Sequence, residues 1–310
     1  MIIPVYKVEP YIERCLHTLF AQTLDDIEYI FVDDCTPDES IAIIHRIAEL
    51  YPGRKEGIRV LSHSENRGLA AARATGLRAA VGEYVISCDP DDYVEEDMYE
   101  KLYSEAVRKD VDIVTCYYWF NEFIMTYDVE ETPQKCLKAM YRKSGMPLSL
   151  CAKLVRREII EKYDIVPYED IDFGEDLNCT VRILYYAKSI SAVKELLYHY
   201  CRREDSLSAN TKNLDTLKKR MRNVALICNF LRENSHGEYE AACNRIKLNL
   251  KRECQSLVYD NEEEWFNMYR ESYRHIFSHN AIPVKSRLVI WLAMRNFRLY
   301  KVMKKIFFDI

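Results

Sequence analysis

The first 115 residues alternate between short apolar runs and segments whose apolar residues recur at helical spacing. The apolar runs predict strands at 2–6, 27–32, 58–61, 84–86 and 111–117. The helical spacing predicts helices at about 9–21, 41–50, 69–81 and 95–109. Strands that alternate with helices of about a dozen residues form βα units, so we expect an α/β fold with a mainly parallel sheet.

The pattern changes in the second half of the chain. Signals are mixed from 118 to about 205, apart from a helical stretch at 177–187 that follows an acidic cluster. From about 211 to the end only helical periodicity is seen. We therefore predict one α/β domain over 1–205 and a helical C-terminal extension over 206–310.

Composition narrows the class of protein. The chain has 310 residues, of which 48% are hydrophobic and 30% charged, as in ordinary soluble globular proteins. Its formal net charge of -5 argues against a nucleic-acid binder, which is usually basic. The 11 Cys include no Cys-x-x-Cys pair, which argues against a zinc or thioredoxin-like site. Since the first residues lack a signal-peptide pattern and no apolar window is long enough to span a bilayer, we expect a cytoplasmic protein.

An acidic motif follows the apolar run 84–86. Asp89, Asp91 and Asp92 offer carboxylate oxygens, which suit Mg²⁺ or Mn²⁺. The alternative is a simple turn, because Asp and Pro both favour turns. In parallel sheets, ligands bind beyond the carboxyl ends of the strands. Asp33 and Asp34 lie at another such end, which favours a ligand site over a turn.

Five motifs then occur in order along the chain. They are Ile2–Tyr6, Val32–Asp38, Asn66–Arg73, Cys88–Tyr93 and Gly174–Leu177. This series resembles family 2 glycosyltransferases, the inverting enzymes of the GT-A fold, densely over about 1–120 and more thinly to about 205. The resemblance implies a GT-A catalytic domain with a mixed, mainly parallel sheet flanked by helices.

The resemblance also implies roles for individual residues on the donor side. A nucleotide-sugar donor would be bound by Pro4, Val5, Tyr6, Asp33, Asp34, Arg73 and Asp89. In this set the Asp pair would contact uracil and ribose, and Arg73 would approach the nucleotide or its phosphates. The alternatives are a turn at the end of the strand for the Asp pair and a solvated helix face for Arg73.

On the catalytic side, the resemblance assigns the metal, Mn²⁺ or Mg²⁺, to Asp89, Asp91 and Asp92, where it would bridge the two phosphates. Asp176 would be the general base that deprotonates the acceptor hydroxyl. Its alternative is a favourable charge at a helix start. We expect the other acidic residues of that region to be solvated loop residues, namely Glu169, Asp170 and Asp172. A basic side chain within 198–208, Arg202 or Arg203, would close over the diphosphate or lie solvated at a strand end.

The expected function is metal-dependent, inverting transfer of a sugar from a nucleoside diphosphate donor, expected to be a UDP-sugar. The acceptor would be a hydroxyl of a glycan or lipid-linked molecule in cell-surface polysaccharide synthesis. One alternative is an inactive nucleotide-sugar-binding protein of the same fold. A receiver domain would need an Asp after the next strand, where 61–64 has none, and a nucleotidyltransferase would need a Gly-rich loop after the first strand.

The last stretch, 282–310, is basic and amphipathic. It could lie on an anionic membrane surface, placing the enzyme at the inner face of the plasma membrane. Alternatively it packs as ordinary helices on the rest of the protein, which we favour slightly.

Overall fold

The computed structural model describes residues 1–142, 145–203, 214–253, 267–278, 282–296, 298–299 and 302. By its internal contacts the chain forms two units, one made of Met1–Gln134 and Pro147–Glu204, the other of Lys135–Met146 and Asp205–Ile310. A short stretch, 135–146, thus groups with the C-terminal unit. The boundary that the sequence predicts near 205, between two separate domains, stays a prediction.

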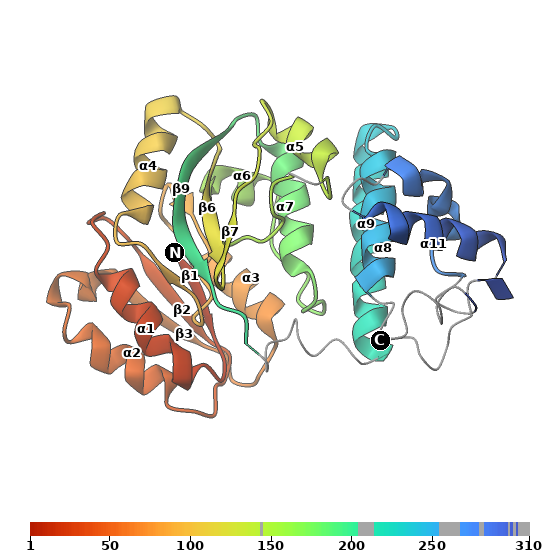
Figure 1. The fold of residues 1–310 in the computed structure, drawn as a ribbon. Coiled ribbons are helices and arrows are strands. Elements are labelled where there is room, and N and C mark those ends of the chain that lie inside the picture. The colour runs from red at the N-terminus through yellow and green to blue at the C-terminus, as the bar shows by residue number, and fades with distance from the viewer. Residues whose placement is uncertain are drawn as a thin grey trace. The chain divides into compact units, whose positions relative to one another are not determined.

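The first unit opens with three βα units (Figure 1). Their elements are β1 (Ile2–Val5), α1 (Glu9–Phe20), β2 (Tyr29–Asp33), α2 (Ser40–Ala48), a 3-10 turn (Pro52–Gly57), β3 (Ile58–Ser62) and α3 (Leu69–Ala79). β1, β2 and β3 form a parallel sheet in that order. The predicted strands and helices of this region are therefore present, with ends that differ by a few residues.

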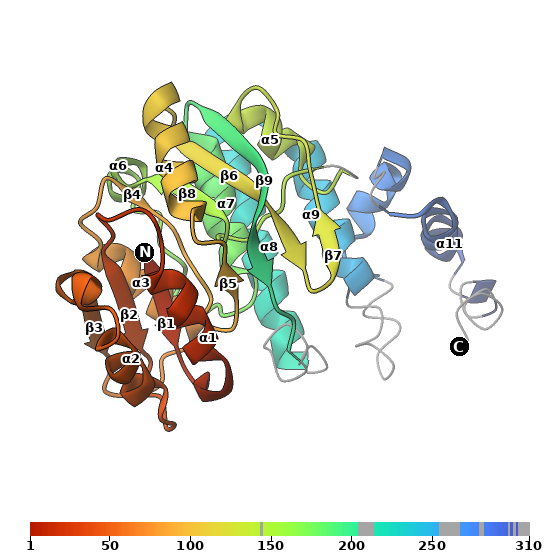
Figure 2. The same cartoon turned by 60° about the vertical axis from the view of Figure 1, so that its left-hand side comes forward.

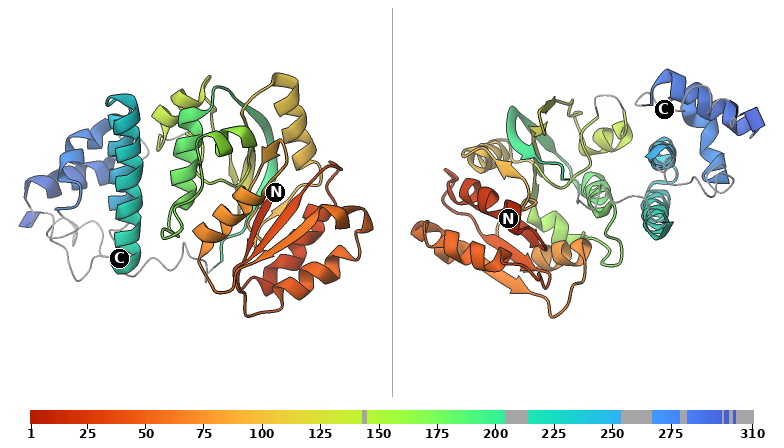
Figure 3. Two further views of the ribbon diagram at one scale, coloured as in Figure 1. Left: turned by 180° about the vertical axis from the view of Figure 1, so that it is seen from behind. Right: turned by 60° about the horizontal axis from the view of Figure 1, so that its bottom comes forward.

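Helices cover both faces of this parallel sheet. Ile3 and Phe31 pack into a core with Ile12 and Leu16 of α1. Because successive strand residues point to opposite faces, the neighbouring Ile2 faces α3, where its side chain occupies the space that a Cβ on Gly76 would need. α3 therefore packs close to β1, as the view from behind in Figure 3 also shows.

The remaining strands form a mixed sheet, seen well in Figure 2. Its order is β4-β8-β6-β9-β5, with β7 paired to β6. The strands are β4 (Tyr84–Val85), β5 (Tyr93–Val94), β6 (Ile113–Phe120), β7 (Phe123–Met125), β8 (Lys153–Arg156) and β9 (Ile190–Tyr200). Only β6 and β9 are parallel here. A mainly parallel arrangement thus holds for the first sheet, whereas antiparallel pairs dominate the second.

The unit that forms the mixed sheet also contains helices α4 (Met98–Lys109), α6 (Arg157–Lys162) and α7 (Glu175–Tyr186). α5 (Pro133–Ala139) lies mostly in the stretch 135–146 that groups with the C-terminal unit. β5, β7, β8 and β9 were not predicted as strands. Two of them are only two or three residues long, and such short strands carry little periodicity to detect. β9 has 11 residues, but buried, half-buried and exposed positions follow one another irregularly along it, so its pattern is ambiguous.

The second unit is helical in its described residues. It contains α8 (Leu214–Ser235), α9 (Glu240–Glu253), a 3-10 segment (Arg270–Ser278) and α11 (Val284–Arg295). A small core joins the last three of these, built from Leu248, Tyr273, Ile276, Ile282 and Ile290. Part of the basic C-terminal stretch is therefore packed, and 303–310 lies outside the described residues. Among the described residues, no helix combines the length and the apolar character that a bilayer-spanning segment needs.

Candidate active site

The acidic motif lies where the sequence analysis predicts it, beyond the carboxyl end of a strand. The segment that leads into it runs parallel to β1, through a bridge between Ile2 and Ser87. Two backbone hydrogen bonds hold it there, from Ile2 N–H to the Ile86 carbonyl (2.9 Å) and from Cys88 N–H to the Ile2 carbonyl (3.0 Å). Asp89 thus emerges beside the end of β1, at the edge where parallel sheets bind ligands.

Asp92 is buried and bonded to β9. Its Oδ1 accepts the backbone N–H of Cys201 (2.8 Å), and its Oδ2 accepts the hydroxyl of Tyr198. Burial, reinforced by repulsion from Asp89 and Asp91, raises the pKa of Asp92 well above its ordinary value. The last residue of the motif is therefore tied to a strand that follows more than 100 positions later.

Asp91 has a basic partner, Arg203, which lies just after β9 and close in sequence to the Cys201 that bonds Asp92. Nε of Arg203 lies 2.7 Å from Asp91 Oδ2. Burial raises the pKa of Asp91, repulsion from Asp89 raises it further, and Arg203 opposes both. Of the two arginines expected near a diphosphate, Arg203 thus reaches the acidic motif, whereas Arg202 donates its backbone N–H to Asn121 (2.9 Å).

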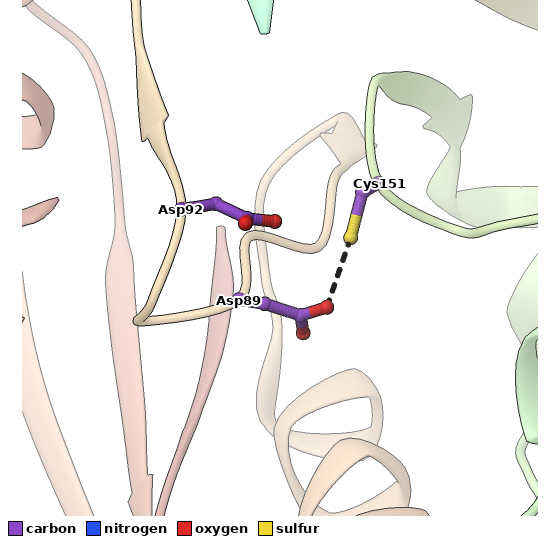
Figure 4. A group of neighbouring side chains, drawn as sticks. All are labelled: Asp89, Asp92 and Cys151. Carbon is purple, nitrogen blue, oxygen red and sulfur yellow. Dashed lines mark hydrogen bonds between the residues drawn. The ribbon is translucent and has the colours of Figure 1, made fainter. Parts of the chain in front are cut away.

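Figure 4 shows Asp89 facing Cys151, whose thiol donates to Asp89 Oδ2 at 3.4 Å. Single ligand atoms of Asp89, Asp92 and Cys151 all lie within 4.8 Å of one another. This separation suits a shared cation, and a cation would offset the repulsion from Asp89 that adds to burial in raising the pKa values of Asp91 and Asp92. Two of the three predicted metal residues, Asp89 and Asp92, therefore fit a divalent metal ion together with the Cys151 thiol, which the sequence analysis did not expect. Asp91 is not part of this group and pairs with Arg203.

Arg73 of α3 connects this motif to the start of α7. Its side chain is only 1% exposed. Nη2 lies 2.5 Å from Asp89 Oδ1, and Nη1 bonds both Glu175 and Asp176, the latter at 2.5 Å. Although burial alone would lower it, the three carboxylates hold the pKa of Arg73 well above its ordinary value.

The two carboxyls at the start of α7 have different surroundings. Glu175 is buried, while the Asp176 side chain is 25% exposed. Burial, with repulsion from Asp176, raises the pKa of Glu175 to about 8. Burial also raises the pKa of Asp176, an effect that Arg73 opposes. The surroundings of Glu175 therefore favour its protonated form, and Asp176 is the more accessible carboxyl of the two.

The predicted floor of the nucleotide pocket lies at the end of β1. Pro4 and Val5 are buried, and Tyr6 beyond them is exposed. Asp33 ends the neighbouring β2, and its Oδ1 accepts the N–H of Thr36 (2.9 Å). These residues lie on adjacent strand ends, as expected from the parallel pairing of Val5 with Asp33.

Asp34, the residue after β2, is buried and bonded within the protein. Its Oδ1 lies 2.7 Å from Nδ1 of His63 and accepts the N–H of Arg67 (2.8 Å), while Oδ2 accepts the N–H of Gly68 (2.8 Å). The carboxylate therefore holds the loop that leads into α3. Its expected contact with the donor stays a prediction, and the geometry favours an indirect role through this loop.

Asp172 was expected to be a solvated loop residue, but it accepts a hydrogen bond from the start of α3. Its Oδ1 accepts the N–H of Ala70 in the first turn of α3 at 3.2 Å. A Cβ on Gly68, which has φ +90°, would lie 2.4 Å from the same oxygen. Asp172 thus satisfies a helix N-terminus from about 100 positions away, a pairing that local spacing cannot show.

Comparison with known proteins places this geometry in a family. The model of "Glycosyl transferase family 2" matches residues 1–164. The "Uncharacterized glycosyltransferase EpsJ" of Bacillus subtilis is 37% identical over 221 residues, 67% of this chain and 62% of that protein. The "Minor teichoic acid biosynthesis protein GgaB" of the same organism is 29% identical over 67% of this chain. The match spans only 23% of GgaB.

Solved structures agree on the fold. S. aureus TarS 1-349 in complex with UDP-GlcNAc has a TM-score of 0.69 at 18% identity, over 95% of this chain and 90% of TarS 1-349. The mannosyltransferase PcManGT from Pyrobaculum calidifontis, in complex with GDP-Man and Mn2+, has a TM-score of 0.57 at 17% identity, over 100% of this chain and 87% of PcManGT. These likenesses confirm the predicted fold class. The family match covers residues 1–164, the region considered for a receiver domain, and excludes that alternative. The chain belongs to glycosyltransferase family 2.

Proposed function

We propose that this protein is a metal-dependent, inverting glycosyltransferase that moves a sugar from a nucleoside diphosphate donor to a hydroxyl. The observation that carries the proposal is the meeting of the acidic motif and the α7 carboxyls on one arginine. Asp89 and Asp176 lie 87 positions apart, and both contact Arg73 at 2.5 Å. A donor motif and a candidate base held on one group suit a single displacement.

In the proposed mechanism, Asp176 accepts the proton of the acceptor hydroxyl as that oxygen attacks the anomeric carbon. The bond to the diphosphate breaks in the same step, so the configuration inverts. Mn²⁺ or Mg²⁺, held by Asp89, Asp91 and Asp92, would supply Lewis-acid stabilisation of the departing diphosphate. Asp33 and the end of β1, Pro4 to Tyr6, would hold the nucleoside.

A UDP-sugar is the donor that we propose, and the acceptor would be a glycan or lipid-linked molecule in cell-surface polysaccharide synthesis. The UDP-GlcNAc complex of TarS supports the donor class. The teichoic acid role in the name of GgaB supports the pathway class. The second candidate, a binding protein without turnover, would keep donor affinity but release no nucleoside diphosphate.

The test is a donor panel that measures release of UDP or GDP from several nucleotide sugars, with and without Mn²⁺. We expect Mn²⁺-dependent release from a UDP-sugar, lost in Asp91→Asn and, for transfer to an acceptor, in Asp176→Asn. Asp97→Asn is the matched control, because Asp97 pairs with Lys101 on α4, outside the acidic motif. Turnover without metal, or full activity of Asp91→Asn, would contradict the metal role. Transfer by Asp176→Asn at the wild-type rate would contradict the role of Asp176 as the general base.

Peripheral binding to the inner face of the plasma membrane is the remaining part of the proposal. In the described part of α11, Val284 and Leu288 are exposed four positions apart, next to exposed Lys285. This pairing of apolar and basic side chains suits an anionic lipid surface. Sedimentation with phosphatidylglycerol-containing liposomes at two salt concentrations tests it, and an absence of lipid-dependent pelleting would end the idea.

A further inference from the structure

Arg73 is the most heavily engaged charged side chain of the candidate site. Its guanidinium contacts carboxylates from two separate parts of the chain, Asp89 after β4 and Glu175 and Asp176 at the start of α7. Sequence resemblance suggests that such an arginine approaches the nucleotide. In the structure both terminal nitrogens are directed at carboxylates instead.

We propose that Arg73 is a positioning residue, which fixes Asp89 and Asp176 relative to each other and does not itself touch the donor. This inference rests on the proposed function, since Asp176 has to be the base for its position to matter. Through Arg73, the donor-side motif and the acceptor-side base are attached to one rigid group on α3.

Burial is the first argument against a donor contact. At 1% exposure the guanidinium has almost no surface to offer a ligand. Its Nε is buried as well, so the whole guanidinium is shielded from solvent. A group held by three carboxylates would lose those contacts in turning toward a phosphate.

The backbone of α3 is the second argument. Ala70, Ala71, Ala72 and Ala74 are buried on this helix, and Gly76 contacts Ile2 of β1 with no room for a Cβ. Small residues allow this close packing, so α3 cannot shift toward the strand ends without opening a gap in the core. The base of the Arg73 side chain is therefore fixed against the sheet.

The shape of the guanidinium is the third argument. Arginine presents several N–H donors in one rigid plane, whereas a lysine ammonium is a point charge on a flexible stem. Only the planar group can hold Asp89 through one nitrogen and the two α7 carboxyls through the other. Lysine at this position would keep the charge but lose the fixed separation.

The experiment compares Arg73→Lys with Arg78→Lys, a matched change on the same helix. Arg78 is more than half exposed and pairs with Glu169, away from the acidic motif. Circular dichroism and thermal melting check that each variant folds, and Arg73→Gln is a second variant in case the lysine form does not. Calorimetric titration with UDP and MnCl₂ gives nucleotide affinity without turnover. Steady-state kinetics use the donor that the wild type turns over in the panel.

For Arg73→Lys we expect kcat for transfer to fall about 100-fold, the size of effect that a misplacement of about 1 Å causes. The Kd for UDP and the KM for the donor should change less than about threefold, and Arg78→Lys should resemble the wild type in all three. Arg73→Lys should slow the Asp176→Asn variant much less than it slows the wild type, because the part of the loss that acts through the base is already present.

A rise of more than about tenfold in the Kd for UDP would overturn the inference, because donor binding itself would then depend on Arg73. Wild-type kcat in Arg73→Lys would overturn it as well. If the wild type turns over no donor in the panel, the proposed function fails, and so does the positioning of a base. Unchanged UDP binding by Arg73→Lys would then support only the absence of a donor contact.

Discussion

Replacing Glu175 by Gln should stabilise the protein, and increasingly so as the pH rises. Burial and repulsion from Asp176 raise the pKa of Glu175 from 4.5 to about 8 in the folded protein. A carboxyl whose pKa is higher when folded binds its proton more tightly in that state. Its contribution to stability is therefore fully present below about pH 4.5 and is lost as the pH rises toward 8. Gln is shaped like the protonated form and does not titrate.

The magnitude follows from the pKa difference. At 1.36 kcal/mol per pH unit, a rise from 4.5 to about 8 corresponds to roughly 5 kcal/mol above pH 8. Glu175 and Asp176 repel each other and both contact Arg73, so removing one carboxyl also changes the pKa of the other, and the single substitution recovers only part of this. We expect Glu175→Gln to gain about 2–4 kcal/mol between pH 5 and pH 8.5.

Differential scanning calorimetry across this pH range measures the effect. A gain of that size corresponds to a rise in Tm of very roughly 5–15 °C for a unit of about 200 residues. Glu169→Gln is the control, because Glu169 is exposed, pairs with Arg67 and Arg78, and has a lowered pKa. That variant should be no more stable than the wild type, with little change between pH 6 and pH 8.5. A Tm difference for Glu175→Gln that does not grow with pH would refute the reasoning.

The other predictions concern the supports of the site and the second unit. Gly68→Ala should lower the free energy of unfolding by more than about 1 kcal/mol, since φ is +90° and the new Cβ meets the Asp172 carboxylate. Urea denaturation measures this loss, and an equal loss in an Asp172→Ala background would contradict the proposed collision. Asp172→Ala alone should cost about 1 kcal/mol through the lost bond to the start of α3. Leu16→Ala, in the core beside β1, should cost about 2–5 kcal/mol. Lys251→Met should raise Tm near pH 7 and lose this advantage toward pH 10, because burial lowers the pKa of Lys251 to about 6; a pH-independent Tm difference would contradict this.

Sequence patterns predicted the parallel sheet and its helices, because each of these elements follows from the residues within its own short segment. β1 is a continuous apolar run, β2 is apolar up to Asp33, and α1 between them buries residues at helical spacing. The mixed sheet is different, since short strands such as β5 exist only through their pairing with distant partners. Tyr93 pairs with His199, for example, and no window of the sequence contains both.

The candidate site divides in the same way. Residue type, order and the family resemblance led to Asp89 and Asp176 as candidates, and both lie 2.5 Å from Arg73 in the structure. The sequence could not show that Arg73 joins them, nor that Cys151 faces Asp89, since both facts depend on three-dimensional packing. Asp34 shows what residue type cannot decide, because an Asp at a strand end can either bind a ligand or accept hydrogen bonds from a loop, as Asp34 does.

The separation of the Arg73 partners along the chain has a consequence for synthesis. Arg73 and Asp89 are 16 positions apart, whereas Glu175 and Asp176 follow Arg73 by 102 and 103 positions. At about 5–20 residues per second, a ribosome needs roughly 5–20 s to supply the later carboxyls. During that interval the emerging α3 carries an arginine with one of its three carboxylates. Fragments that end at residue 164, where the family match stops, would keep it in that state permanently.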